Sequence, residues 1–152
     1  MNIDEIFETS LFKELKDYLI ENSIYNPQVV KKYTQESKVF PIVTVILTES
    51  SYDYQTLTYG EDTEPFEIEI NVYSTDVGDA SKRTVCNEIT KHIVDFWKNN
   101  YKVKMSVKKD FANIDVSVHR NYIKVTGVLD TKYGSEHFVI YPTLKNSRSY
   151  WY

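Results

Sequence analysis

The stretch Phe66-Glu67-Ile68-Glu69-Ile70-Asn71-Val72 is the clearest secondary-structure signal in the chain. Apolar and polar residues alternate strictly through it, and this period of two is typical of a β-strand with one buried face. The apolar residues are predicted to face a core, and the polar residues to face solvent or an interface. Because a slip of one residue would turn the apolar side chains to water, this strand sets the register of the sheet that it joins.

A helix is predicted before this strand, over residues 3–20, where apolar side chains recur at helical spacing. Asn2 followed by Glu5 has the form of a capping box at its start. Asn26-Pro27 ends the helical segment, because a proline disfavours helical backbone in the residue before it. The predicted buried stripe consists of Ile3, Ile6, Phe7, Leu11, Phe12, Leu15, Tyr18 and Leu19.

A second helix is predicted after the strand, over residues 80–97. Gly78-Asp79 breaks the chain and supplies an N-cap, and Asn99-Asn100 closes the helix. Its predicted stripe is Val85, Ile89, Ile93 and Phe96 or Trp97.

Four further segments have strand character. Residues 39–47 are nearly all apolar, which favours a central strand covered on both faces. Residues 102–108 alternate apolar and basic side chains, which predicts an amphipathic strand with a basic outer face. Residues 114–129 change parity at His119-Arg120-Asn121, and we favour a bulge within one long strand over a three-residue turn there. A short last strand is predicted over residues 138–141.

A long polar connection separates the first two strands, over residues 48–65. Alternating tyrosines and threonines favour a projecting hairpin, and the alternative is a disordered surface loop. The residues that we expect to make contacts from this segment are Tyr52, Tyr54, Tyr59, Glu61 and Asp62.

Together these elements predict an α+β domain over residues 1–142, with a mainly antiparallel sheet and two principal helices packed on it, followed by an aromatic tail over residues 143–152. The chain has 152 residues, of which 41% are hydrophobic and 26% charged, as expected for one globular domain. Its formal charge of −4 argues against a general nucleic-acid binder. No signal peptide or membrane span is recognisable, so we expect a protein that stays inside the cell.

No catalytic motif is recognisable, and we expect neither an enzyme nor a bound metal or cofactor. The three histidines, His92, His119 and His137, are widely spaced. Glu67 and Glu69 share one face of a strand and could hold a divalent ion, but the polar face of a half-exposed strand is the simpler interpretation. Cys86 is predicted to be a buried thiol.

Charge is segregated along the chain. Residues 39–81 contain nine acidic side chains and no lysine or arginine, whereas Lys98, Lys102, Lys104, Lys108 and Lys109 follow one another without an intervening acid. Two such patches could meet head to tail between copies, as in a closed ring. Aromatic residues are enriched at interface cores, so the terminal Tyr150-Trp151-Tyr152 is a further candidate contact.

Residues 113–130 resemble the C-terminal portion of the tail-completion proteins of tailed bacteriophages, the tail terminators and head-to-tail joining proteins of the neck. The resemblance lies in Asn113-x-Asp115, in Arg120 a few residues later, and in a strand that ends in Thr126-Gly127-Val128. Asn71-Val72-Tyr73-Ser74 and Pro41-Ile42-Val43 match the family in their places before the second helix and in the first strand.

The resemblance implies a sheet-plus-helices subunit of the virion that forms a hexameric ring on the tail tube. Such a ring stops tube polymerisation and joins the tail to the head connector, and DNA passes through its acidic lumen without specific binding. The family often has a second basic or aromatic residue beside the arginine, where this chain has Asn121-Tyr122-Ile123. The alternative for Arg120 is a strand-edge residue paired with a carboxylate.

The expected partners are other copies of this chain, the tail tube protein and the head connector protein. Beyond the hairpin and the aromatic tail, the expected contact residues are Glu67, Glu69, Lys102, Lys104, Lys108 and Arg120. Two alternatives stay open: a head-side connector, stopper or minor capsid protein, and a small metal-dependent nuclease that uses the two glutamates.

Overall fold

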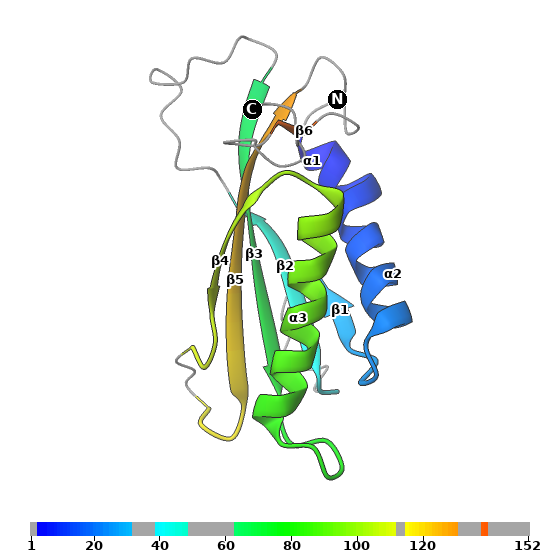
Figure 1. Ribbon diagram of the computed structural model, residues 1–152, viewed down its shortest axis with the longest axis vertical. Helices are drawn as coiled ribbons and strands as arrows, with labels where there is room; N and C mark the ends of the chain where they lie inside the picture. The colour runs from blue at the N-terminus through cyan, green and yellow to red at the C-terminus, as the bar shows by residue number, and fades with distance from the viewer. Residues whose placement is uncertain (1–2, 32–38, 49–62, 112–114, 131–137, 140–152) are drawn as a thin grey trace.

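The computed structural model describes residues 3–31, 39–48, 63–111, 115–130 and 138–139, and these form one mixed β-sheet with helices on one face (Figure 1). The predicted α+β class is confirmed. In chain order the elements are α1 (Ile3–Ile6), the π-helical turn η1 (Phe7–Leu11), α2 (Phe12–Asn22), β1 (Gln28–Val30), β2 (Ile42–Thr48), β3 (Thr63–Ser74), α3 (Lys82–Asn100), β4 (Lys104–Lys108), β5 (His119–Asp130) and β6 (Phe138–Val139).

The sheet has the strand order β1-β2-β3-β5-β4, and β6 pairs with β5 beyond the end of β4. β1 runs parallel to β2, and every other pairing is antiparallel. β3 is the central strand, because it pairs with β5 along its whole length and with β2 over seven residues. The predicted alternation is confirmed, since Phe66, Ile68, Ile70 and Val72 are all buried.

The N-terminal helix is confirmed and runs on to Asn22. Its buried side chains, from Ile3 through Phe7, Leu11 and Leu15 to Leu19, recur at every fourth residue. In a regular α-helix of 3.6 residues per turn, each such step advances by roughly 40° around the axis. The wider turn of η1 offsets part of this drift and keeps the stripe on the core. The predicted cap at Asn2 lies outside the described residues.

α3 is also confirmed, but it begins later than predicted. Its N-cap is Ser81, whose Oγ accepts a hydrogen bond from the Thr84 N–H at 3.2 Å. Gly78-Asp79 instead forms a tight turn, because the flanking residues exchange two backbone hydrogen bonds and Gly78 has a φ of +58°. All five predicted stripe residues are buried, and the helix ends at Asn100 as expected.

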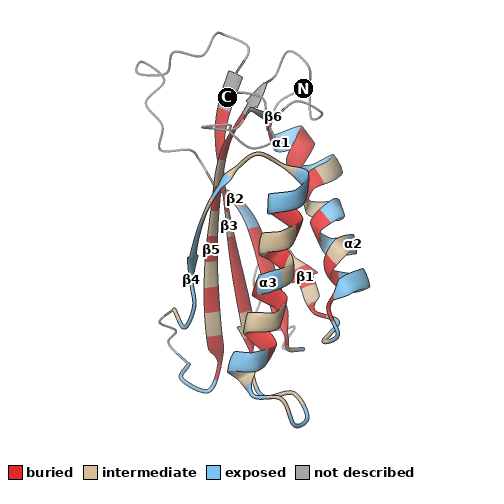
Figure 2. Ribbon diagram, in the orientation of Figure 1, coloured by how far each residue is buried: buried red, intermediate tan, exposed pale blue. Residues whose placement is uncertain are grey.

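The core lies between the helices and one face of β3 and β5 (Figure 2). An aromatic cluster joins the helices, in which Phe96 lies 5.5 Å from Tyr18 and 5.3 Å from Trp97 between ring centroids. No helix within the described part of the chain is long and apolar enough to cross a lipid bilayer.

β2 differs from the central strand that was predicted over residues 39–47. Val39 is 70% exposed, the strand begins at Ile42, and it lies next to the sheet edge. A short parallel strand, β1, was not predicted, and it pairs with only the first three residues of β2. Both faces of β2 are buried at its start, but Ile46 is 38% exposed.

The prediction of one long strand with a bulge over residues 114–129 is wrong, and so is the alternative turn at 119–121. β5 begins at His119, and the residues before it turn back on themselves. The Asp115 carboxylate accepts hydrogen bonds from the Ser117 N–H and hydroxyl, and the Val118 N–H donates to the Asp115 carbonyl. A side chain that binds nearby backbone in this way competes with strand pairing, and Val116 is left 88% exposed.

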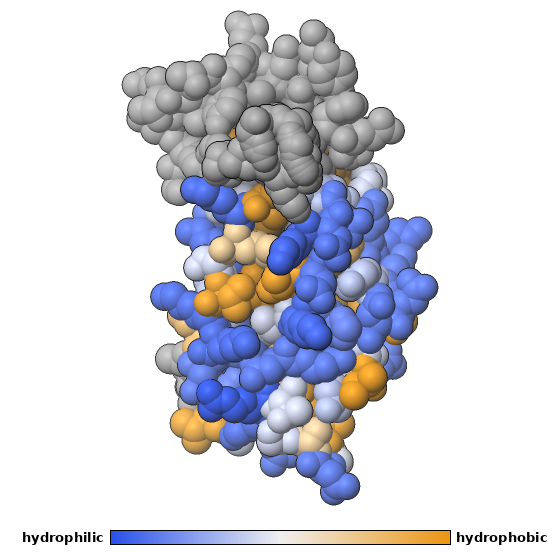
Figure 3. All heavy atoms as spheres, in the orientation of Figure 1, coloured by the Kyte–Doolittle hydropathy of each residue, from blue (hydrophilic) through white to orange (hydrophobic). Residues whose placement is uncertain are grey.

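β4 is confirmed as a strand with lysines on one face, but its apolar face is only partly covered. Met105 is half-buried, and Val107 is 39% exposed because β4 lies at the sheet edge. Figure 2 shows β4 exposed along most of its length. Apolar side chains gather in a strip between β4 and α3 on the side seen in Figure 3.

The last strand begins where it was predicted, but only its first two residues, which form β6, are described. The aromatic tail over residues 143–152 lies outside the described residues.

Gly127 leaves room for the side chains of Phe66 and Val103 on the helix side of the sheet. It lies directly opposite Phe66, and a Cβ atom placed on it would come within 2.8 Å of the Phe66 ring and 3.2 Å of Val103. The glycine of the Thr126-Gly127-Val128 motif therefore has a packing role in this chain.

We expect Gly127→Val to lower the free energy of unfolding by about 1–3 kcal/mol, because the added side chain overpacks a filled site. Urea denaturation monitored by circular dichroism measures the change. Thr126→Val is the matched control, since that half-exposed side chain lies on the opposite face of the sheet. An unchanged stability for Gly127→Val would contradict the packing role.

A buried polar cluster joins β5 to α3. The Asn121 amide group donates to Asn87 Oδ1 at 3.0 Å and to Thr90 Oγ1 at 2.9 Å. Its Oδ1 accepts from the Asp110 N–H at 3.0 Å and lies 2.9 Å from His119 Nε2, so this ring nitrogen carries the donated proton. Asn121 is completely buried, and the cluster satisfies both donors and the acceptor of its amide.

Asn121→Ala is expected to lower the free energy of unfolding by about 2–3 kcal/mol, because it leaves buried polar partners without hydrogen bonds. Asn99→Ala, at an exposed position near the end of α3, serves as the matched control. Equal denaturation midpoints for the two variants would refute a stabilising role of the cluster.

Candidate functional site

The face of the sheet opposite the helices, which we call the outer face, carries most of the predicted contact residues that the structure describes. Strand alternation places the even-numbered residues of β4 and β5 and the odd-numbered residues of β3 on this face. The residues concerned are Lys104, Ser106 and Lys108 on β4, Arg120, Tyr122, Lys124 and Thr126 on β5, and Glu67, Glu69, Asn71 and Tyr73 on β3.

The two glutamates are paired within the subunit. Lys124 Nζ lies 3.4 Å from Glu67 Oε1, and the Thr48 hydroxyl donates to Glu67 Oε2 at 3.2 Å. Glu69 lies opposite Lys124 and accepts a hydrogen bond from Tyr122. Burial raises the pKa of the Tyr122 hydroxyl, and the negative charge and hydrogen bond of Glu69 raise it further. The simpler interpretation of the pair, as the polar face of a strand, agrees with these contacts.

Arg120 is not a strand-edge residue, because it pairs with Tyr73 of β3 on one side and its carbonyl accepts a hydrogen bond from the Phe111 N–H on the other. Its Nε donates to Asn71 Oδ1 at 2.8 Å, and its guanidinium carbon lies 4.7 Å from the Phe111 ring centroid and 5.7 Å from that of Tyr73. Phe111 in turn stacks on Tyr122, with 5.2 Å between centroids. The guanidinium is thus held in a fixed orientation by rings and an amide, as cation–π geometry favours.

The predicted lysines lie toward the edge of the same face. Lys104 and Lys108 are exposed on β4, and Lys102 lies two residues before the start of the strand. Lys108 Nζ lies 5.6 Å from the Phe111 ring centroid. The acids on β3 and the lysines on β4 are therefore not on opposite faces of the subunit, but on one face with β5 between them.

Eight predicted contact residues lie outside the described part of the chain: Tyr52, Tyr54, Tyr59, Glu61, Asp62, Tyr150, Trp151 and Tyr152. The structure brings together Glu67, Glu69, Lys104, Lys108 and Arg120 on the outer face.

The side chains with catalytic potential have structural partners. Cys86 is fully buried, and its Sγ lies 3.6 Å from the carbonyl oxygens of Val72 and His119. His92 lies 3.0 Å from Glu88, which also accepts from the Ser23 hydroxyl and so ties α2 to α3. No group of three histidine, cysteine or acidic side chains that could hold a metal ion occurs within the described residues.

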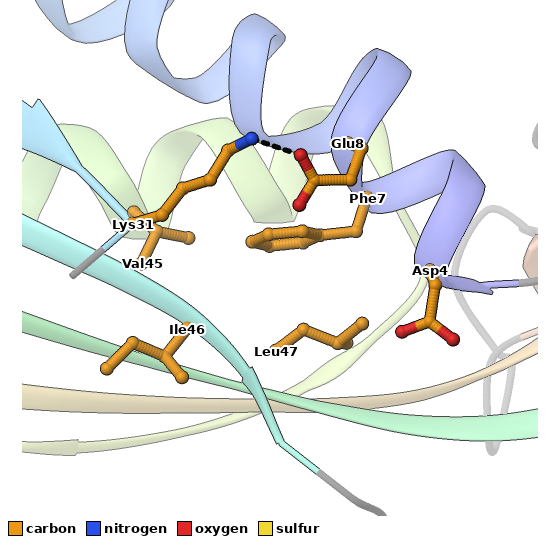
Figure 4. A pocket seen from close by; sticks show the side chains of 7 residues that line it. All are labelled: Asp4, Phe7, Glu8, Lys31, Val45, Ile46 and Leu47. Carbon is orange, nitrogen blue, oxygen red and sulfur yellow. Dashed lines mark hydrogen bonds and ion pairs between the residues drawn. The ribbon is translucent and has the colours of Figure 1, made fainter.

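A pocket of about 260 Å³ lies between the N-terminal helical segment and β2 (Figure 4). Phe7, Val45, Ile46 and Leu47 give it an apolar lining, and Asp4, Glu8 and Lys31 supply charge. Lys31 forms an ion pair with Glu8 across the pocket. Sequence reasoning missed this site because its residues come from three separate segments, although the short apolar pair Val29-Val30 could have indicated the strand beside it.

The chain matches no protein-family model and none of the curated proteins with which it was compared.

Cys86 is expected to resist modification in the folded protein. Burial raises the pKa of its thiol to about 12. Since only the thiolate attacks, and the raised pKa keeps the buried thiol protonated at pH 8, a disulfide reagent should label it only after unfolding. Labelling followed with and without denaturant measures this, and rapid reaction of the native protein at pH 8 would contradict the burial.

Proposed function

We propose that this chain is a structural subunit of a bacteriophage tail, which caps the tail tube as a ring and joins the tail to the head connector. The observation that carries the proposal is the resemblance of residues 113–130 to tail-completion proteins, with Arg120 and Thr126-Gly127-Val128. The architecture supports it, since a sheet with helices on one face is the subunit type that the resemblance implies.

The charge distribution of the outer face also supports the proposal. Acidic side chains lie on β3, closer to the β2 side of the sheet, and lysines lie on the opposite edge strand, β4. Copies arranged side by side would bring unlike charges together, because the basic edge of one subunit would meet the acidic side of the next. Such contacts are heterologous, and they close into a ring when the rotation per subunit permits.

The proposed action is geometric. A ring matched to the tube rim occupies the surface that the next tube ring would need, and growth of the tube stops. The opposite surface of the ring is then available to the connector. An acidic lumen repels phosphate, so DNA can pass through the ring without being retained.

Light scattering on the purified full chain tests the proposal, first alone at low and moderate salt and then with tail-tube protein added. We expect either a discrete ring or a monomer that caps short tubes. A monomer indifferent to tube protein but bound by portal complex would contradict tail capping and favour a head-side connector.

Charge reversal tests the electrostatic part. The triple variant Lys102→Glu, Lys104→Glu and Lys108→Glu should lose assembly in size-exclusion chromatography and tail-length control in an infection assay, because like charges would then meet. The matched control reverses the exposed helix residues Lys13, Lys16 and Lys98, which changes the net charge equally. If both triple variants assemble normally, the lysines of the β4 region have no role in pairing.

A further inference from the structure

Within the described residues, the sheet has backbone positions at both of its edges with which no strand pairs. β1 pairs with β2 only from Ile42 to Thr44, and no described residue pairs with that side of β2 from Leu47 onward. At the other end of the sheet, β4 pairs with β5 on one side, and no described strand lies on its other side. Open edges of this kind readily accept another strand.

The direction of the backbone groups at the β2 edge follows from one hydrogen bond. The Gln28 N–H donates to the Pro41 carbonyl at 2.9 Å, so odd-numbered residues of β2 direct their polar groups toward β1. Past the end of β1, the N–H and C=O of Leu47 therefore point to the open edge beside the pocket. No described strand meets them there.

The same alternation continues across the sheet to β4. Even-numbered residues of β2 direct their backbone N–H and C=O groups toward β3. When the strand pairings are followed across the sheet, the backbone N–H and C=O groups of even-numbered β5 residues point toward β4. The Phe111 N–H donates to the Arg120 carbonyl at 2.7 Å, which agrees with even-numbered β5 residues directing their backbone groups away from β3. The N–H and C=O groups of Met105 and Val107 consequently point away from β5, to the side of β4 on which no described strand lies.

Both edges carry apolar side chains on the helix side of the sheet. Met105 and Val107 face the helix side of the sheet, next to the apolar strip between β4 and α3 (Figure 3). The β2 edge offers on its helix side the pocket lined by Phe7 and Leu47 (Figure 4). Apolar side chains of an added β4 strand would thus extend toward an apolar pocket.

From these observations we infer that β4 of one copy adds to the open edge of β2 in the next copy. This inference rests on the proposed ring. β2 and β4 run in opposite directions within the sheet, because three antiparallel pairings separate them. Subunits repeated side by side around an axis along the strands therefore present β4 antiparallel to β2, and the sheet continues from one subunit into the next.

Charge complementarity selects a second copy as the occupant. In this arrangement the lysines of β4 lie on the outer face next to Ile46 and Thr48. Glu67 and Glu69 are directly opposite these two residues on β3. Neighbouring strands are about 4.8 Å apart, so the lysine ammonium groups would lie close enough to both carboxylates for electrostatic attraction. Lysines on an edge strand can also keep that edge from pairing with another strand, and the experiments below distinguish this role from a role in assembly.

Cross-linking tests the contact directly in the full chain. Ile46 and Ser106 are both exposed on the outer face, and the double variant Ile46→Cys, Ser106→Cys is treated with a short bismaleimide. We expect a ladder of covalent multimers that ends at the ring, because each subunit would be joined on both sides. The matched control combines Ile46→Cys with Ile24→Cys, which is 78% exposed and lies on neither edge.

A proline variant provides an independent readout. Val107→Pro removes an N–H that points outward, so the pairing of β4 with β5 is retained while addition of a further strand is blocked. Its mass by light scattering should fall to that of the monomer, whereas Val107→Ala, which keeps the N–H, should assemble.

The inference is overturned if the double-cysteine variant yields no more multimers than its control, or if folded Val107→Pro forms a normal ring. In that case a ring that caps tubes would leave the proposed function intact, with its subunit contact elsewhere. Conversely, edge-linked multimers that ignore tube and portal protein would support the contact and refute the tail function.

Discussion

β3 pairs with β5 along one edge and with β2 along the other, and its apolar face packs against the helices. The other elements of the fold are therefore positioned by β3. It pairs with β5 over all of its 12 residues and with β2 over seven. Its apolar side chains are buried under the helices, and its glutamates are directed to the outer face. A single periodic pattern thus determines both where the core lies and which face carries charge.

The elements that could be predicted are those whose signal is local and repetitive. The alternation in β3 and the apolar stripes of the two helices depend only on neighbouring residues, and all three were recognised. Elements decided by a single side chain were missed or misplaced. Asp115 turns the chain where parity indicated a strand, and Ser81 caps α3 two residues after the predicted Asp79. β1 is three residues long and offers too short a pattern to detect.

The candidate site was predictable in composition but not in arrangement. Segregation of acids and lysines along the chain indicated charged patches, but only the strand order reveals that Glu67 and Lys104 share one face. The setting of Arg120 depends on Asn71 and Phe111, which are distant in sequence. The pocket beside β2 likewise forms between segments that no local pattern connects.

The buried amide of Asn121 has a consequence for the specificity of folding. Alternation excludes a shift of β5 by one residue, but a shift by two would keep apolar side chains inward at most positions. A shift by two would also move the Asn121 amide away from Thr90 and Asn87 and leave it buried without hydrogen-bond partners. The free-energy penalty for such a polar group rises with its burial. The buried Asn121 therefore favours the native register of β5 over shifted registers that would bury apolar side chains almost as well.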